Sequence, residues 1–194
     1  MFVSHASREL LFRLVVTGER GSGAPAVVDA AHPIFGQQAP TTRGAGTWSS
    51  RDYSFTPQGL EPVHGYTIRM LLHGLDSAGP GTDPCDLSGF RDVDGLLVVG
   101  AAGAPDALAA TLARCAGYVG ALGYDVSGFP LVVGALGGGD VTGLAARFGL
   151  GNRPVLPLVL EDTRTTAGAV KACLKQMLVA LKEDRIRTVH GTPM

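Results

Sequence analysis

The sequence predicts an α/β domain in which a parallel sheet lies between two layers of helices. Short apolar runs typical of buried strands alternate with helical patterns along the chain, as in parallel βαβ units. The 194 residues suffice for one domain, and a hydrophobic content of 45% against 17% charged residues excludes a disordered chain. We expect this single domain to cover residues 1–186, followed by a flexible tail over 187–194.

The first strand is an apolar run that ends in a glycine-rich turn. Residues 10–16 read Leu-Leu-Phe-Arg-Leu-Val-Val, and the run ends at Gly18. The turn over residues 18–23 leads into a short helical stretch, residues 24–31. Pro25 suits the first turn of that helix, where a missing N–H costs nothing.

The next part of the chain is dominated by two loops, each of which follows or precedes a weaker strand. Residues 32–50 are rich in Gly, Pro, Thr and Gln and are typical of a long exposed loop. We expect strands at 47–55 and 66–73, and a second loop over 74–88, where Gly, Pro and Asp cluster.

The second half of the chain has the clearest patterns. Residues 93–99 form a strongly apolar strand, and after Pro105 apolar residues recur at helical spacing over 106–122. The most regular helix covers 165–182, with an apolar stripe along one side. Shorter elements complete the alternation, namely strands at 130–133 and 154–160 and a helix at 141–148.

Charge and cysteine usage exclude several classes of function. A net charge of −1 gives no field that would attract nucleic acid, and no apolar run approaches the ~20 residues that span a bilayer. The N-terminal segment lacks the apolar core of a secretory signal. Cys85, Cys115 and Cys173 show neither zinc spacing nor an even disulfide set. We therefore expect a cytoplasmic protein with reduced thiols that neither binds nucleic acid nor inserts into a membrane.

Metal and hydrolase chemistry find little support in the sequence. Its histidines are scattered without ligand spacing. A nucleophile elbow at Ser77 would need glycine two residues earlier, where Leu75 stands.

Several segments agree in order and spacing with one known family. They are Ser7 to Glu9, the glycine turn 18–23, the strand 93–99, Gly123 to Asp125, and Pro130 with its strand. From about Ser4 to about Lys182 the chain resembles the bacterial gliding-motility GTPases of the MglA type, which are Ras-like. The resemblance implies a Ras-like P-loop GTPase fold, with a mostly parallel six-stranded sheet and helices on both faces.

The phosphate-binding motif departs from the pattern of that family. A P-loop has Gly, four residues, then Gly-Lys-Ser/Thr, in which lysine binds phosphate and the hydroxyl holds magnesium. Gly18 and Gly23 have the required spacing, but Ala24 stands at the lysine position and Pro25 at the hydroxyl position. Proline also removes a backbone donor. Each lost hydrogen bond to a charged phosphate costs about 1.5–3 kcal/mol, so nucleotide affinity is expected to fall steeply.

The other nucleotide motifs are eroded as well. The resemblance places the γ-phosphate motif on 72–78, where only His73 or Asp76 could orient water. The guanine-specifying Asn-Lys-x-Asp stretch falls on 134–140, where only Asp140 survives. The late base contact has no counterpart in 161–165.

The leading hypothesis is therefore a non-catalytic pseudo-GTPase that has no cofactor and acts by binding proteins. The resemblance implies a Roadblock/LC7-like partner of the MglB type, or an active MglA-type GTPase. The expected interface is the switch surface, roughly 44–55 and 74–85, because Ras-like proteins usually bind effectors through their switch segments. Aromatic residues are enriched at interface hot spots. The candidate partner-binding residues are Trp48, Tyr53, Phe55, His73 and Asp76.

The alternative is an atypical GTP-binding protein that holds GTP or GDP and magnesium with other residues. Arg20 or Arg43 would then supply the phosphate charge. Glycine N–H groups at a helix start can also bind an anion without lysine. The degenerate loop comprises Gly18, Arg20, Gly21, Gly23, Ala24 and Pro25.

Overall fold

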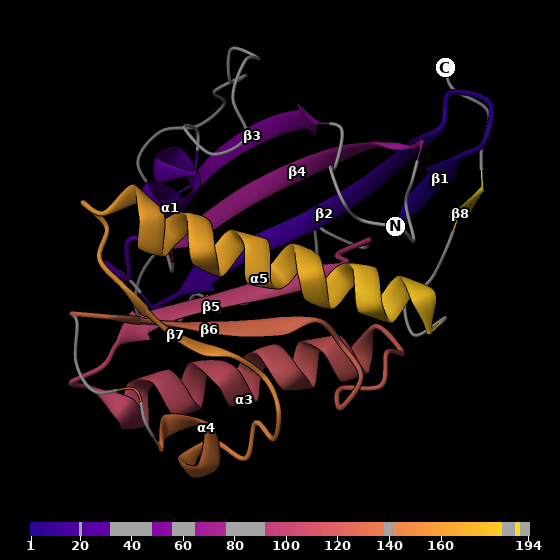
Figure 1. The fold of residues 1–194 in the computed structure, drawn as a ribbon. Helices are drawn as coiled ribbons and strands as arrows, with labels where there is room; N and C mark the ends of the chain where they lie inside the picture. Colours follow the sequence, from indigo (N-terminus) through magenta and orange to yellow (C-terminus); the bar gives the residue numbers. More distant parts are fainter. Residues whose placement is uncertain are drawn as a thin grey trace.

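The computed structural model describes most of the chain as a three-layer α/β domain (Figure 1). It describes residues 1–19, 21–31, 48–55, 65–76, 92–137, 141, 143–183 and 189–190, with the backbone alone at 48–51, 53, 55, 76, 189 and 190. A twisted sheet forms the middle layer, and helices cover both of its faces. The alternation expected from the sequence is confirmed.

The main sheet has six strands in the order β3-β4-β2-β5-β6-β7. All neighbours are parallel except β3, which runs antiparallel to β4. The sheet is thus mostly parallel, as expected. The strands are β2 (Glu9–Gly18), β3 (Trp48–Phe55), β4 (Thr67–Asp76), β5 (Gly95–Ala101), β6 (Leu131–Leu136) and β7 (Val155–Leu158).

Strand β2 is the centre of the fold because it is paired along both edges. It pairs with β4 over its whole length and with β5 from Leu14 to Gly18. Alternate residues such as Phe12 and Leu14 are fully buried in one core, while Val15 belongs to the core on the other face. A strand buried on both faces requires the nearly continuous apolar run seen in the sequence.

The two cores lie under different helices. Helices α1 (Ala24–Ala30) and α5 (Thr163–Lys182) pack on one face of the sheet. Helix α3 (Pro105–Ala121) and the short α4 (Leu144–Arg147) lie on the other. Helix α5 begins at Asp162, whose side chain accepts a hydrogen bond from the Arg164 N–H, the usual way to satisfy a helix start.

Some boundaries differ from the sequence prediction. Strand β4 continues to Asp76, so the residues from Gly74 to Asp76 are not loop as expected. The reason is the partner strand, because the β2 ladder continues until Gly18 faces Asp76. The expected helix at 141–148 is reduced to the single turn of α4.

Two short strands were not predicted. Strand β1 (Phe2–Ser4) pairs antiparallel with the start of β2, and β8 (Val189–His190) pairs parallel with β1. The sheet therefore includes part of the segment expected to be a flexible tail. Elements of two or three residues are too short to show a period in the sequence.

A buried charge cluster lies beside the middle of β2, where β5 begins. The ammonium group of Met1 pairs with Asp94, which is 1% exposed. The other carboxylate oxygen of Asp94 accepts the Arg13 backbone N–H at 2.8 Å. Burial raises the pKa of Asp94, and the ammonium group and these hydrogen bonds oppose that rise. One carboxylate thus ties the chain's first residue to two neighbouring strands.

Candidate functional site

The glycine turn lies at the carboxyl end of β2, where the order of the strands reverses. From β2 the chain adds β4 on one side and later β5 on the other, so the two connections leave in opposite directions. Ligands of open α/β sheets generally bind outside the carboxyl ends of strands at such a point. This is the place where the sequence predicts a degenerate phosphate loop.

The turn is closed by hydrogen bonds within itself. The Ser22 N–H donates to the Glu19 carbonyl at 2.8 Å, and the buried Ser22 hydroxyl lies 3.4 Å from the Ala24 nitrogen as an acceptor. Pro25, the next residue, has no N–H. Of the backbone positions that would cradle a phosphate in a P-loop, residues 22 and 24 therefore have an acceptor within the turn, and residue 25 offers no donor.

Close packing accounts for both glycines that carry the P-loop spacing. A Cβ on Gly18 would lie 2.2 Å from the Val99 carbonyl oxygen. Gly23 has φ of 73°, and a Cβ there would lie 2.7 Å from Leu160 Cδ1. These glycines are needed for the strand-to-helix connection itself, whether or not an anion is bound.

No cation stands at the lysine position. Ala24 is fully buried at the start of α1, and Pro25 lies in the first turn of this seven-residue helix. Arg20 and Arg43, the basic residues of the alternative hypothesis, lie outside the described residues.

Gly74 has a packing role on β4. A Cβ at this position would lie 2.8 Å from both the Ala24 carbonyl oxygen and Pro25 Cα. The first turn of α1 therefore rests directly on the β4 backbone. The glycine expected near a γ-phosphate is explained by this contact between helix and strand.

His73 and Asp76 both lie on β4, and the backbone of Asp76 is the one that faces the glycine turn. His73 is half-buried, and burial, followed by the nearby Arg13 charge, lowers its pKa. Its backbone faces Val15 and Ser50 of the neighbouring strands. The Asp76 backbone faces Gly18 at the glycine turn, and its side chain lies outside the described part.

The three aromatic candidates lie on the edge strand β3. Register pairs Tyr53 with Met70 and Phe55 with Ile68, whereas Trp48 pairs with Leu75. Since residues alternate between the faces of a strand, positions 53 and 55 share one face and position 48 lies on the other. The structure thus brings the three onto one strand but not onto one face.

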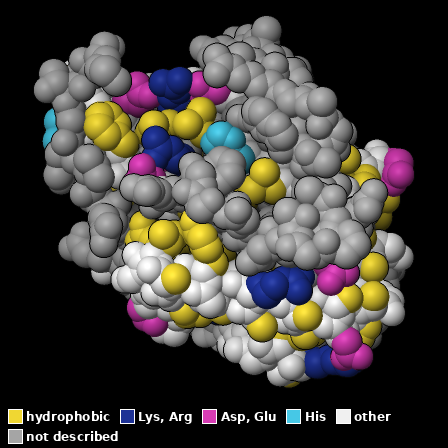
Figure 2. Space-filling view, turned by 180° about the vertical axis from the view of Figure 1, so that it is seen from behind, with side chains coloured by type: hydrophobic (Ala, Val, Ile, Leu, Met, Phe, Trp, Pro, Cys, Tyr) yellow, Lys and Arg dark blue, Asp and Glu magenta, His cyan; other side chains and the backbone are white. Residues whose placement is uncertain are grey.

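The face of β4 opposite α1 carries mixed charges. The Arg69 guanidinium binds the Asp52 carboxylate of β3 at 2.5 Å and lies 3.9 Å from Glu9 of β2. Arg13 pairs with the exposed Asp92 at 2.7 Å. The rear view in Figure 2 shows basic, acidic and hydrophobic side chains interspersed rather than a field of one sign. This pattern does not select a strongly charged ligand.

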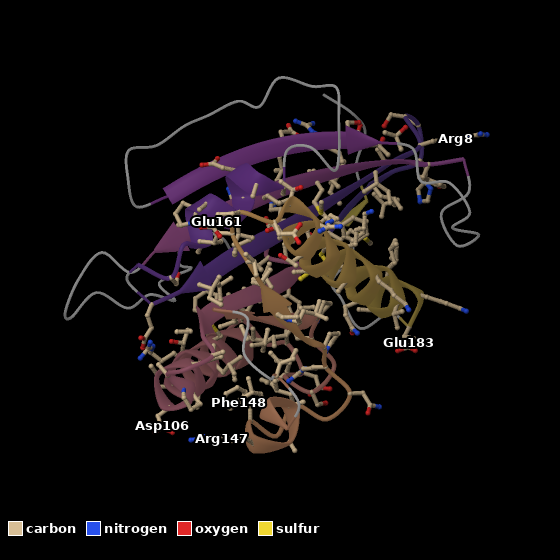
Figure 3. The ribbon with its side chains drawn as sticks, turned by 60° about the vertical axis from the view of Figure 1, so that its left-hand side comes forward. Arg8, Asp106, Arg147, Phe148, Glu161 and Glu183 are labelled. Atoms are coloured by element: carbon tan, nitrogen blue, oxygen red, sulfur yellow. The ribbon has the colours of Figure 1, made fainter. Side chains whose placement is uncertain are left out.

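The later motif segments also have structural roles. A Cβ on Gly134 of β6 would lie 2.1 Å from Leu158 Cδ1 of β7. Glu161 lies in the turn before α5 (Figure 3), followed by the capping residue Asp162. The Thr165 hydroxyl accepts the Val159 N–H at 3.1 Å, which fixes this turn. Asp140 lies outside the described residues.

Neither a metal centre nor a reactive thiol is indicated in the described ranges. No group of three or more His, Cys, Asp or Glu side chains there is placed to hold a metal ion. Cys115 and Cys173 are buried cysteines outside disulfide bonds, and burial raises the pKa of Cys173. Within the same part of the chain, no helix combines the length and apolarity needed to cross a bilayer.

Comparison with known proteins identifies no family for this chain. No protein-family model matches the sequence, and no curated protein is significantly similar to it.

Proposed function

We propose that this protein is a cytoplasmic, MglA-like pseudo-GTPase with a Ras-like fold, which binds other proteins without binding or hydrolysing GTP. One observation carries the proposal. The turn that would hold phosphate is closed on itself through Ser22, with Ala24 buried and Pro25 lacking an N–H. A mostly parallel six-stranded sheet between two helical layers supports the fold assignment.

The energetic argument concerns the phosphate groups. A P-loop stabilises them with a lysine and several backbone donors, each worth about 1.5–3 kcal/mol when it binds a charged group. Here the lysine position is alanine, and the Ser22 N–H already has an acceptor. To bind a nucleotide, the turn would have to break the described hydrogen bonds without the P-loop lysine in return.

The proposed partner is a Roadblock/LC7-like protein of the MglB type, or an active MglA-type GTPase. The proposed contact surface is the edge strand β3 with the carboxyl end of β4, which includes Trp48, Tyr53, Phe55, His73 and Asp76. An edge strand offers unpaired backbone groups as well as side chains to a partner. Support for this surface is its position at the sheet edge beside the glycine turn.

Complex formation without nucleotide tests the proposal. We expect the purified protein and an MglB-type protein to co-elute in size-exclusion chromatography with neither GTP nor GDP present. Trp48→Ala should weaken the complex, whereas Lys175→Ala on the exposed side of α5 should not. A complex that forms only after GTP loading would contradict the proposal.

A further inference from the structure

A small pocket lies between the glycine turn and helix α3. Its volume is about 130 Å³. The floor is formed by the ends of β5 and β6, one wall by the turn, and the opposite wall by the first half of α3. The lining residues that carry the argument are Glu19, Ser22, Ala104, Ala107, Leu108 and Thr111.

The size of the pocket selects among ligands. Ligand sites for molecules of nucleotide size usually measure about 300–1,000 Å³, whereas an apolar cavity of about 150 Å³ takes benzene. At about 130 Å³, this pocket is suited to one small ring or one branched apolar side chain. It also lies between the carboxyl ends of β2 and β5, where ligands of such sheets bind.

The described hydroxyl groups that line the pocket already have partners in the protein. The Thr111 hydroxyl donates to the Ala107 carbonyl at 3.1 Å and accepts from the Arg114 guanidinium at 3.1 Å. The Ser22 hydroxyl is in hydrogen-bond range of the Ala24 N–H. The end of β5 is paired with β6 up to Ala101 and Leu136. Among the described lining residues, these groups therefore offer a polar ligand little replacement for its own water, whereas an apolar group needs none.

The rim, in contrast, is charged and half-exposed. Glu19 lies 3.9 Å from Arg114, and the two side chains are 47% and 39% exposed. At the start of α3, Asp106 pairs at 2.7 Å with Arg147 of α4, which lies beside the same helix (Figure 3). An apolar centre inside a polar rim is the usual arrangement of an interface hot spot. The Glu19 and Arg114 charges are of opposite sign, so this described pair adds no net positive charge that would attract a phosphate.

We propose that this pocket, defined by its lining residues above, receives a single apolar side chain of the partner protein, of the size of Phe or Leu. The inference rests on the proposed function. The glycine turn forms a wall of this pocket with its own hydrogen bonds intact, and the Glu19–Arg114 pair meets polar groups of the partner around the inserted side chain.

Benzene serves as the probe for the inserted ring. Methyl NMR spectra of the full chain should show saturable shifts of the Leu108 and Leu136 methyl groups on titration with benzene. Ala107→Leu fills the pocket and should reduce these shifts at least tenfold. Ala110→Leu, the same change at an exposed position on α3, should leave them unchanged. Ala104→Leu provides a second filling variant at the exposed rim, in case Ala107→Leu fails to fold.

The second part of the experiment measures binding to the partner protein. In the complex with the MglB-type protein, Ala107→Leu should weaken binding at least tenfold and Ala110→Leu should not. The pocket proposal would be overturned if benzene caused no shifts. It would also be overturned if both filling variants left the benzene shifts and the affinity of the complex unchanged. Either result would leave the pseudo-GTPase proposal standing. Saturable shifts of the same methyl groups with GDP would overturn both. If benzene shifts the methyl signals but the filling variants do not weaken the complex, the pocket binds a small molecule, and the proposal of an inserted partner side chain is overturned.

Discussion

Strand β2 has different charge environments at its middle and at its carboxyl end. At the middle, the Met1 ammonium group, Asp94 and the Arg13 N–H form a buried cluster. At the carboxyl end, where a phosphate site would lie in a P-loop protein, the described residues of the turn make neutral hydrogen bonds, and the nearby Glu19–Arg114 pair is half-exposed. Among these described groups, the buried charge therefore lies at the middle of β2, where it links the chain's first residue to the sheet.

The same contrast applies to the residues of the turn. Glycines at 18 and 74 stand where a Cβ would meet backbone atoms, and Gly23 has a positive φ, so the fold itself favours glycine at all three positions. A lysine and a magnesium-binding hydroxyl, which a P-loop uses for its nucleotide, are absent from positions 24 and 25. Four predictions test this contrast, from the largest effect to the smallest.

Removal of the buried carboxylate should have the largest effect. In protein without residues ahead of Met1, Asp94→Ala leaves the ammonium group buried without its acid and should lower the free energy of unfolding by about 3–5 kcal/mol. Asp92→Ala removes an acid that is 61% exposed and should cost less than about 1 kcal/mol. Urea unfolding measures both. Equal losses would show that the buried Met1–Asp94 cluster contributes no more than a surface pair.

At the carboxyl end of β2, the stability of the protein should depend on side-chain volume rather than on charge. Gly18→Ala places a methyl group against the Val99 carbonyl and should cost about 1–3 kcal/mol, in the range of overpacked sites. Gly103→Ala meets no atom within 4 Å and serves as the matched control. If Gly18→Ala unfolds at the same urea concentration as Gly103→Ala, the packing explanation of this glycine is wrong.

Thr166 offers a stabilising change near the carboxyl end. Its hydroxyl is the one buried side-chain polar atom in the described part of the chain without a hydrogen-bond partner. Thr166→Val keeps the shape and removes the unsatisfied group, which should raise stability by about 1 kcal/mol. Thermal unfolding should show a gain of about 2–4 °C for a domain of this size. Thr166→Ser, which retains the hydroxyl, should show no gain in thermal stability. A gain in the Thr166→Ser variant alone would show that the unsatisfied hydroxyl is not what lowers stability.

His73 should make a small contribution to the pH dependence of stability. Its folded pKa is lowered by burial and by Arg13, so the unfolded chain binds a proton first as the pH falls below about 6.5. Stability should therefore decrease between about pH 6.5 and the lower folded pKa. His73→Gln should flatten this part of the curve, measured by urea unfolding between pH 7 and 5. An unchanged slope would place the titration on another residue.

The sequence predicted the scaffold better than the site. Apolar period and alternation revealed β2, β5, α3 and α5, because burial on one or both faces imposes those patterns. Strands β1 and β8 were not predicted, because β8 pairs with a strand at the other end of the chain and both elements are very short. The alanine at position 24 could be read directly from the sequence, but the buried Ser22 hydroxyl and the pocket beside α3 depend on three-dimensional contacts.

Nucleotide content is the measurement that tests the central claim most directly. The protein is purified without added nucleotide, denatured, and the released small molecules are separated by chromatography. The account predicts no GDP or GTP, and no thermal stabilisation by excess GTP with magnesium, although a ligand at 100 times its Kd would add about 2.7 kcal/mol. Stoichiometric GDP or GTP would contradict it and would favour the atypical GTP-binding protein, in which Arg20 or Arg43 replaces the missing lysine.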